Sequence, residues 1–264
     1  MAVTYGNSLL SKIRWIIRLL SSLLVSFQQS SNDWHADFED SNKADGLILL
    51  GYGDYVDFEE KLHKLIEQGT HFVRWGAQVD DLNITSIGCD NFLGGELFTE
   101  HLIKRGRKEI AFLGTASSHA PEFLDRYKGH CAALETHGLT INKNLQFNAL
   151  YTEEAGYEAA SDLIKSGLPF DGICAACDLI AIGAMRALQE HGLKIPEDVS
   201  VVGFDDIAIA SFAVPPLTTV KQDTQLAGEL LVETLLATIN GQNKPTSLIP
   251  PKLIVRKSCG SSTI

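Results

Sequence analysis

Several side chains able to bind a ligand follow the short apolar segments of this sequence. Such segments are typical of buried strands, and in open parallel sheets ligands bind at the carboxyl ends of the strands. The residues in these positions include carboxylates, aromatic rings and a thiol, and Arg126 lies nearby in the sequence. They are Arg74 and Trp75, Asp90 and Asn91, residues 115–119, Tyr151, Cys177 and Asp178, and Asp205 and Asp206.

This set of side chains suits a ligand that is rich in hydroxyl groups. Carboxylates accept hydrogen bonds from paired hydroxyls, a guanidinium group donates several in a fixed fork, and aromatic faces cover the C–H groups of a sugar ring. Because each charge-assisted hydrogen bond contributes roughly 1.5–3 kcal/mol, a handful of them suffices for micromolar affinity. We therefore predict a binding site for a sugar or a related small molecule.

Some of these residues also have simpler structural explanations. Asp90 and Asp178 each stand where a helix begins, so helix capping explains Asp90 as well as ligand binding does and explains Asp178 somewhat better. Tyr151 and Trp75 are equally consistent with plain core aromatics. The acidic pair at 205–206 precedes no strong helical pattern, which favours a functional role for it.

Other chemistries have little support in the sequence. Cys174 and Cys177 form a C-x-x-C pair, but Cys174 lies inside a predicted strand, and no second cluster completes a zinc site. The sequence contains no complete dinucleotide fingerprint, phosphate loop or nucleophile elbow, and its eight histidines form no H-E-x-x-H pair. We therefore predict that the chain is not an enzyme and has no catalytic residue, metal or cofactor.

Apolar and amphipathic segments alternate from about residue 45 onward, which predicts an α/β fold with parallel sheets. The predicted strands cover 46–50, 71–75, 84–89, 109–113, 145–151, 171–176, 199–204 and 253–256, with a short extended segment over 217–220. The predicted helices cover 58–68, 91–104, 121–136, 153–165, 179–189 and 225–239. The helices from 91–104 onward are each followed by a glycine that ends the helix: Gly106, Gly138, Gly167, Gly192 and Gly241.

The composition argues against nucleic-acid binding and membrane insertion. The formal net charge is -11, whereas a surface that binds phosphates is basic, so DNA contact would need a separate basic module. Residues 9–27 form the only candidate membrane or signal segment, and Lys12, Arg14 and Arg18 interrupt it. Five scattered cysteines form no disulfide framework. We predict a cytoplasmic protein.

Longer motifs carry a family resemblance. Residues 196–206 read PEDVSVVGFDD, and residues 215–223 read PPLTTVKQD. Residues 178–192 read DLIAIGAMRALQEHG, and residues 90–106 read DNFLGGELFTEHLIKRG. In this order and spacing, the motifs resemble the effector-binding domain of the LacI/GalR (lactose-repressor/galactose-repressor) family of bacterial transcription factors, and the resemblance covers residues 45–258.

The resemblance implies a periplasmic-binding-protein-like fold, in which two parallel-sheet lobes are joined by three crossing segments and bind a small effector between them. The crossings are expected near residues 88–90, 222–224 and 249–251. The N-terminal lobe is then expected to hold residues 1–88 plus 224–248, the C-terminal lobe residues 89–223 plus 249–258, and the tail residues 259–264.

The resemblance also implies roles for individual residues. Arg126 matches the arginine with which the family grips its sugar, and Asp205 matches the aspartate that binds hydroxyls. Gln222 and Tyr151 match positions in the ligand cleft. Trp75 lies near the position where many members carry an aspartate after a strand of the N-terminal lobe.

The helix that begins near Cys177 departs from the family pattern. Members usually carry Asn-Asp at this point, and here the pair is Cys177-Asp178. A thiol is only weakly polar, which implies a ligand with fewer hydroxyls on that edge. Cys177 and Asp90 complete the predicted set of ligand-binding residues.

The start of the sequence departs from the family as well. The first strand of the N-terminal lobe could occupy only residues 2–5 of this sequence. No helix-turn-helix motif is present. The expected partners are a small effector, a second copy of the chain, and operator DNA through a headpiece that this chain does not contain. The alternative function is that of a periplasmic sugar-binding protein of a transport system, for which we find no credible signal segment.

Overall fold

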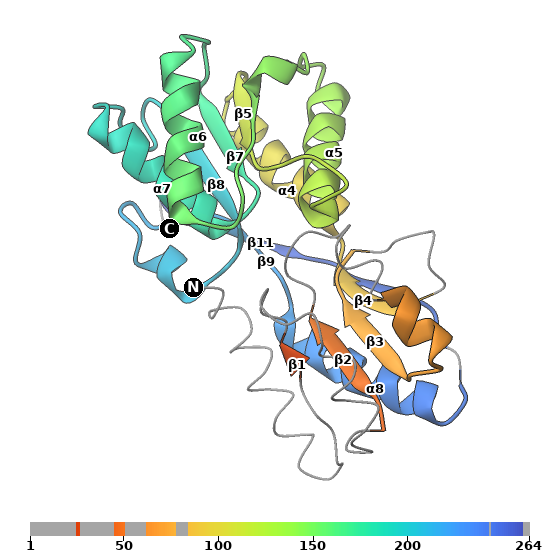
Figure 1. The fold of residues 1–264 in the computed structure, drawn as a ribbon. Helices are drawn as coiled ribbons and strands as arrows, with labels where there is room; N and C mark the ends of the chain where they lie inside the picture. The colour runs from red at the N-terminus through yellow and green to blue at the C-terminus, as the bar shows by residue number, and fades with distance from the viewer. Residues whose placement is uncertain (1–24, 27–44, 51–61, 78–83, 243, 261–264) are drawn as a thin grey trace. The chain divides into compact units, whose positions relative to one another are not determined.

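The computed structural model describes residues 25–26, 45–50, 62–77, 84–242 and 244–260 (Figure 1). They divide into two compact units. Unit 1 contains the described residues up to Cys89 together with Asp223–Ile249, and unit 2 contains Asp90–Gln222 and the described residues from Pro250 onward. The chain therefore passes from one unit to the other three times.

Unit 1 is built on a five-stranded sheet in the order β1-β2-β3-β4-β10, and every neighbouring pair is parallel. The strands are β1 Val25–Ser26, β2 Leu47–Leu50, β3 Phe72–Trp75, β4 Ser86–Cys89 and β10 Ser247–Ile249. Helix α8, Thr224–Ile239, packs against β2, β3 and β4. Residues 62–67 are helical, and the rest of the helix predicted over 58–68 lies outside or at the edge of the described segment.

The residues of β2 alternate between two layers of the unit 1 core. Ile48 and Leu50 join a buried cluster with the apolar residues of α8, whereas Leu47 and Leu49 join a second cluster with Leu62 and its helical neighbours. Successive side chains of a strand point to opposite faces, so the continuous apolar run of β2 is explained by a sheet that is covered on both faces.

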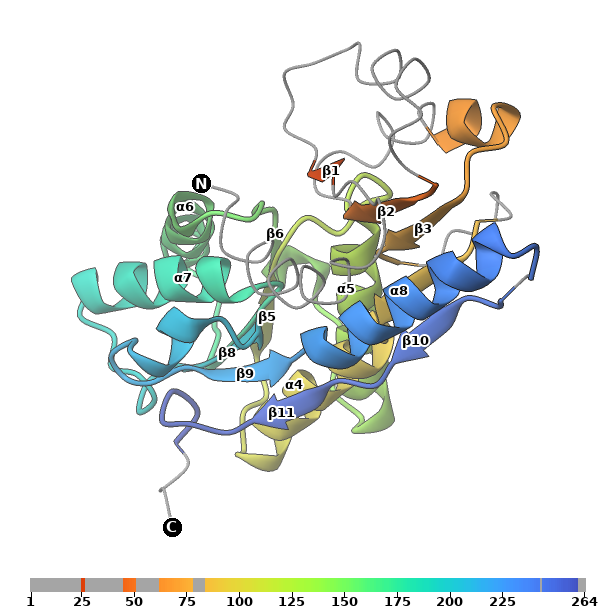
Figure 2. The same cartoon turned by 90° about the horizontal axis from the view of Figure 1, so that it is seen from below.

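Unit 2 is built on a six-stranded sheet in the order β11-β9-β8-β7-β5-β6, which is parallel except for the β11–β9 pair. The strands are β5 Ile110–Leu113, β6 Gln146–Phe147, β7 Gly172–Ala175, β8 Ser200–Asp205, β9 Thr218–Lys221 and β11 Lys252–Ile254. The helices are α4 Asn91–Lys104, α5 Pro121–Thr136, α6 Glu153–Lys165 and α7 Asp178–Glu190, with short 3-10 turns η2 Lys143–Leu145 and η3 Ala208–Ser211. Figures 1 and 2 show α4 and α5 on one face of the sheet and α6 and α7 on the other.

Glycines bring the helices of each pair into close contact. A Cβ on Gly129 of α5 would overlap the carbonyl of Phe92 in α4, and a Cβ on Gly95 of α4 would overlap the carbonyl of Arg126 in α5. On the opposite face, a Cβ on Gly156 of α6 would overlap the carbonyl of Ile180 in α7. The two pairs therefore pack backbone against backbone, which fixes where Arg126 lies.

Most of the predicted elements are confirmed. The helices over 121–136 and 153–165 have the expected bounds, and the glycine after each helix has a left-handed φ, between 67° and 87°. The strand predicted over 145–151 is wrong in length: only Gln146–Phe147 pair with β5, because η2 precedes them and the chain leaves the sheet after them. Strand β10 was not predicted, because its three residues show no periodic pattern.

The predicted features of the N-terminal segment mostly lie outside the described residues. They include the first strand over 2–5 and nearly all of the candidate membrane segment over 9–27, of which only β1 is described. Within the described part of the chain, no helix combines the length and the apolar character that a membrane span requires.

The packing of α6 predicts different losses of unfolding free energy for two alanine substitutions, one within the helix and one at the glycine that follows it. Gly156→Ala places a methyl group against the backbone of α7, where overpacking costs up to about 3 kcal/mol. Gly167→Ala meets open space and costs only the left-handed φ of that position, about 1–2 kcal/mol. Urea denaturation should therefore show the larger loss of unfolding free energy for Gly156→Ala, and an equal or smaller loss would contradict the close packing of α6 against α7.

Candidate ligand-binding site

Arg126 on α5 is the centre of a group of polar side chains at the carboxyl ends of the strands of unit 2. Its Nε donates a hydrogen bond to Oδ1 of Asn91 over 2.9 Å, and one terminal nitrogen donates to the carbonyl oxygen of Ala176 over 2.5 Å. The guanidinium carbon lies 3.6 Å from the centroid of the Phe204 ring. Contacts to α4, to the end of β7 and to β8 thus hold the charged group in one orientation.

Asp205 and Gln222 lie beside this guanidinium group. Nε2 of Gln222 donates a hydrogen bond to Oδ1 of Asp205 over 2.6 Å, and the same oxygen lies 3.9 Å from a terminal nitrogen of Arg126. The Arg126 and Asp205 side chains are only 5% and 6% exposed. Burial raises the pKa of Asp205 well above its ordinary value, and the hydrogen bond from Gln222 opposes that shift. The structure therefore brings together three of the predicted ligand-binding residues.

The backbone of Asp205 and Asp206 is strained. Their φ angles are 120° and 55°, a region that favours glycine. Such a conformation costs on the order of 1–3 kcal/mol per residue and persists only where the surroundings hold it. The strained turn directs the Asp205 carboxylate toward Gln222 and Arg126.

A pair of aromatic rings, Phe123 and Tyr151, begins beside Arg126. The ring of Phe123, one turn before it on α5, has its centroid 5.4 Å from the guanidinium carbon. The ring of Tyr151 lies 4.6 Å from that of Phe123, and Tyr151 is 38% exposed. The predicted residue Tyr151 thus extends an apolar surface away from the charged group.

Cys177 and Asp90 both stand at helix starts. Cys177 is the N-cap residue of α7, directly after the carbonyl that binds Arg126. Burial raises the pKa of Cys177 to about 11, so its thiol is neutral near pH 7. Asp90 caps α4, because its Oδ1 accepts a hydrogen bond from the backbone N–H of Leu93 over 2.9 Å. A contact of either residue with a ligand remains a prediction.

The structure assigns the other predicted residues to other places. Trp75 belongs to unit 1, where it packs against the core cluster shared by the sheet and α8. The capping explanation for Asp178 is wrong: Cys177 holds the cap position. The fully buried carboxylate of Asp178 instead accepts hydrogen bonds from the backbone N–H of Ile207 over 2.9 Å and from the Thr219 hydroxyl over 2.5 Å.

Sequence reasoning missed three residues that hold Arg126. Asn91 was noted only as a polar residue after a strand, and it is buried against the guanidinium group. Phe204 and Phe123 were not selected, although Phe204 precedes Asp205 and Phe123 stands three positions before Arg126. That i, i+3 spacing on a helix was the one signal that pointed to Phe123.

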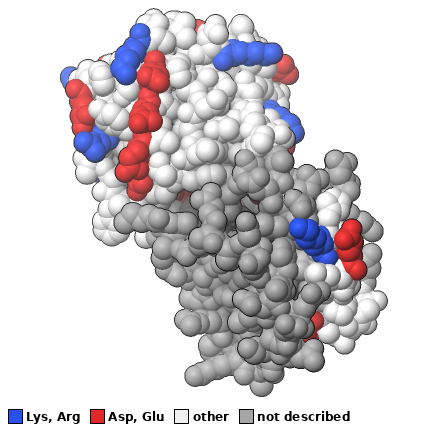
Figure 3. Space-filling model, viewed as in Figure 1, with Lys and Arg blue, Asp and Glu red and all other residues white. Residues whose placement is uncertain are grey.

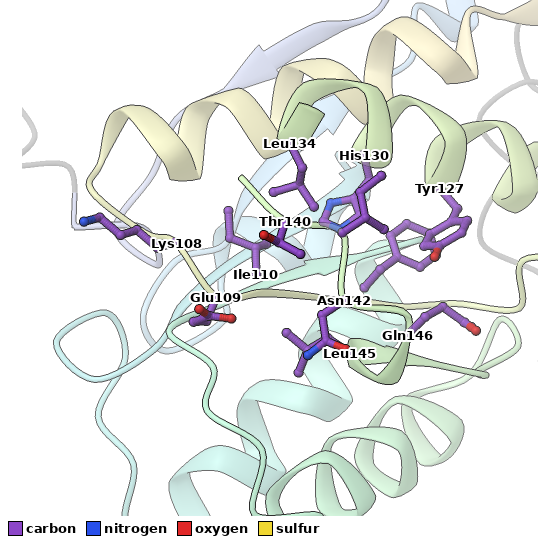
Figure 4. A pocket seen from close by; sticks show the side chains of 12 residues that line it. Lys108, Glu109, Ile110, Tyr127, His130, Leu134, Thr140, Asn142, Leu145 and Gln146 are labelled. Atoms are coloured by element: carbon purple, nitrogen blue, oxygen red, sulfur yellow. The ribbon is translucent and has the colours of Figure 1, made fainter. Parts of the chain in front are cut away.

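Other features of unit 2 offer no comparable site. Among the described residues, no group of three or more His, Cys, Asp or Glu is placed to hold a metal ion. A cavity of about 10 Å³ lies between α5 and the start of β5, lined by Tyr127, His130 and Thr140 among others (Figure 4). It has room for about one water molecule, and none of the predicted ligand-binding residues lines it.

Comparison with known proteins identifies the class and then the family. Residues 99–259 match the family model of the periplasmic binding protein-like domain, which is the class that the parallel sheets and the triple crossing indicate. Curated HTH-type transcriptional regulators and solved regulators of the LacI family match the chain, which therefore belongs to the LacI/GalR family and represents an effector-binding domain of it.

Three relatives illustrate the match. The HTH-type transcriptional regulator AscG of Escherichia coli (strain K12) is 38% identical over 174 residues, which are 66% of this chain and 52% of AscG. The HTH-type transcriptional repressor PurR of Glaesserella parasuis serovar 5 (strain SH0165) is 36% identical over 222 residues, 83% of this chain and 64% of PurR. The solved transcriptional regulator CelR–cellobiose complex has a TM-score of 0.78 at 29% identity, covering 85% of this chain and 68% of that protein. The chain therefore spans about half to two thirds of the length of these relatives.

The environment of the thiols predicts their reactivity. Cys174 is fully buried, and burial raises the pKa of both Cys174 and Cys177, so little thiolate is available for alkylation. Peptide mapping after N-ethylmaleimide treatment at about pH 7.5 should find both residues unmodified in the folded protein and modified after denaturation. Partly exposed Cys131 serves as the internal control. Rapid labelling of Cys177 in the folded state would contradict the buried, neutral thiol.

Proposed function

We propose that this chain is the ligand-sensing domain of a bacterial LacI-type transcriptional regulator and that it binds a sugar or a related polyol. The observation that carries the proposal is the contact group of Arg126, Asp205 and Gln222 at the carboxyl ends of the strands of unit 2. Support comes from the relatives, which are transcriptional regulators rather than enzymes, and from the CelR structure, which contains cellobiose.

The chemistry of the group suits hydroxyls. The guanidinium of Arg126 donates hydrogen bonds, and the Asp205 carboxylate accepts them. Hydroxyl donors stabilise the ionised form of a carboxylate whose pKa burial has raised, so binding and ionisation of Asp205 favour each other. The rings of Phe123 and Tyr151 offer an apolar face for the C–H groups of a sugar.

In the proposed mechanism, the effector contacts both units and changes their relative orientation. In an intact dimer this change alters the spacing of the DNA-binding headpieces. The ligand acts only through its different affinities for the two arrangements. We propose that Trp75, Cys177 and Asp90 complete the contacts with the effector, and that the regulator works in the cytoplasm without a cofactor.

Operator binding would then depend on a headpiece outside this chain. The chain is acidic, and on the face of unit 2 drawn in Figure 3 the described basic residues lie apart from one another, most of them beside an acidic residue, and form no broad patch. Such a surface offers few of the cation–phosphate contacts on which DNA affinity depends. The alternative of a periplasmic transport protein is less well supported, because the relatives AscG and PurR are regulators of transcription.

The proposed site predicts a specific loss of affinity. Isothermal titration calorimetry with glucose, galactose, ribose and cellobiose, and with adenine as a ligand without hydroxyls, should detect at least one sugar that binds the unmodified protein. Asp205→Ala should weaken that binding by about 10- to 100-fold, because a charge-assisted hydrogen bond contributes roughly 1.5–3 kcal/mol. Asp162→Ala, on the exposed side of α6, should leave the affinity unchanged. Equal affinities of the unmodified protein and Asp205→Ala, or binding of adenine alone, would contradict the proposal.

We further propose that the chain pairs with a second copy, as the family resemblance implies, and that an exposed apolar surface of unit 2 takes part in the pairing. The surface consists of Ile209, Phe212 and Val214, in and directly after η3, which are 52%, 81% and 78% exposed. Three large apolar side chains exposed within six residues are unusual on a surface that only faces water.

Sedimentation velocity at micromolar concentration tests the proposed pairing. The unmodified chain should sediment as a dimer, and Phe212→Ser combined with Val214→Ser should shift it toward monomers, because the buried apolar area is lost. Leu150→Ser, an exposed apolar residue elsewhere in unit 2, is the control. A monomeric unmodified chain would rule out this pairing.

A further inference from the structure

The turn formed by Asp205, Asp206 and Ile207, which we call the aspartate turn, carries the central carboxylate of the proposed site. Two consecutive residues of this turn have left-handed φ angles although neither is glycine. Such a conformation reverts to a relaxed one unless neighbouring groups hold it. Groups outside the turn must therefore hold it in place.

Hydrogen bonds connect two backbone amides of the turn to one buried carboxylate, that of Asp178. The N–H of Ile207 donates to Oδ2 of Asp178 over 2.9 Å. The N–H of Asp206 donates to the Thr219 hydroxyl over 3.3 Å, and that hydroxyl donates to Oδ1 of Asp178 over 2.5 Å. Asp178 on α7 and Thr219 on β9 thus connect two neighbouring elements to the turn, and both residues are fully buried.

The Asp178 side chain is confined to this position. A Cβ on Gly203 would overlap its Oδ1, so β8 leaves room for the carboxylate only because it carries glycine there. Asp206 is held separately, by an ion pair of 2.6 Å with Arg256 and a longer one of 3.7 Å with Lys221. These ion pairs fix the Asp206 side chain, whereas the amides of the turn depend on Asp178 and Thr219.

In both hydrogen bonds of Asp178 to its neighbours, the carboxylate is the acceptor. An ionised carboxylate accepts from both donors, the Ile207 amide and the Thr219 hydroxyl. A protonated carboxyl carries its proton on one oxygen, which becomes a donor and at best a weak acceptor, so the bonds from the Ile207 amide and the Thr219 hydroxyl lose their charge assistance and one of the two loses its strong acceptor. A buried donor without an acceptor is costly, and the network is complete only while Asp178 is ionised.

We propose that Asp178 is a positioning residue of the binding site: its ionised carboxylate, acting directly and through Thr219, holds the aspartate turn and thereby keeps the Asp205 carboxylate beside Arg126 and Gln222. The consequence for affinity rests on the proposed function. The consequence for the turn itself does not, because it follows from hydrogen bonds within unit 2.

The network makes the turn sensitive to pH near neutrality. Burial raises the pKa of Asp178 to about 7, and the negative charge of Asp206 adds to the shift. The hydrogen bonds from Thr219 and Ile207 and the positive charge of Arg256 oppose it. Protection of the turn and affinity for a ligand should therefore rise as pH increases through about 7.

The contribution of Asp178 to the free energy of unfolding should change with pH in the opposite direction. The pKa of Asp178 is higher in the folded state than the ordinary value of 3.8, so between these values the folded state binds more protons than the unfolded state. The contribution of Asp178 to the free energy of unfolding then decreases as pH rises from about 4 to about 7 and is constant above that range. As pH rises, the turn should become better protected while the contribution of Asp178 to the free energy of unfolding decreases. These opposite trends distinguish the positioning role of Asp178 from simple stabilisation of the fold.

Hydrogen–deuterium exchange of the turn is the direct test. In Asp178→Asn, the amides of residues 206 and 207 should exchange at least about tenfold faster than in the unmodified protein, because a neutral amide side chain has one oxygen acceptor for the two donors, the Ile207 N–H and the Thr219 hydroxyl, and lacks the charge that strengthens both bonds. Asp171→Asn is the matched control: Asp171 stands just before β7 and accepts from the backbone of Lys108 and Glu109, away from the turn. Unchanged exchange of the turn in Asp178→Asn would overturn the proposal.

A second pair of variants covers the case in which Asp178→Asn does not fold. Thr219→Val removes the relay hydroxyl at nearly constant volume, and Thr219→Ser keeps it. Exchange of the Asp206 amide should be faster in Thr219→Val and close to that of the unmodified protein in Thr219→Ser. Equal exchange in the two variants would show that the hydroxyl does not hold the turn.

Calorimetry with the tightest-binding sugar of the panel tests the effect on the site. At about pH 8, Asp178→Asn should bind that sugar at least about tenfold more weakly than the unmodified protein, and at about pH 6 the two affinities should converge. Faster exchange with an unchanged affinity would overturn the positioning role. If no sugar binds any variant, the proposed function fails, and the exchange experiments still decide whether Asp178 holds the turn.

Discussion

The burial of the Arg126 charge is the constraint on which the described site depends. A guanidinium group removed from water is stable only when its hydrogen bonds and its charge are matched by protein groups. Here the partners come from different parts of unit 2: the Asn91 amide at the start of α4, the Ala176 carbonyl after β7, and the Asp205 carboxylate at the end of β8. Because the glycine contact holds α4 against α5, these groups converge on one point.

Of the partners of Arg126 named above, the Asp205 carboxylate makes the longest contact with the guanidinium group. It lies 3.9 Å from the nearest guanidinium nitrogen, beyond hydrogen-bond distance, and burial raises its pKa. Its position also requires a strained backbone, which the buried carboxylate of Asp178 helps to hold. A site in which a buried carboxylate has few donors of its own is suited to a ligand that brings donors, and hydroxyl groups are such donors.

Much of the fold follows from local patterns, whereas the site depends on tertiary contacts. Helix α5 was predicted with its exact bounds, since proline at its start and glycine after its end are local signals. Strand β10 was missed because its pairing with β4 brings together residues about 160 positions apart, and nothing in its three residues records that. The same limit applied to Asn91 and Asp178, whose partners lie on other elements: both were treated as polar residues at helix starts, and their burial was not visible in the sequence.

The most direct test of the central claim is a crystal structure of the chain with the tightest-binding sugar of the calorimetry panel. Ligand hydroxyls should lie within about 3.2 Å of a guanidinium nitrogen of Arg126 and of a carboxylate oxygen of Asp205. A sugar bound elsewhere on the protein, with both side chains contacting only protein groups, would contradict the account.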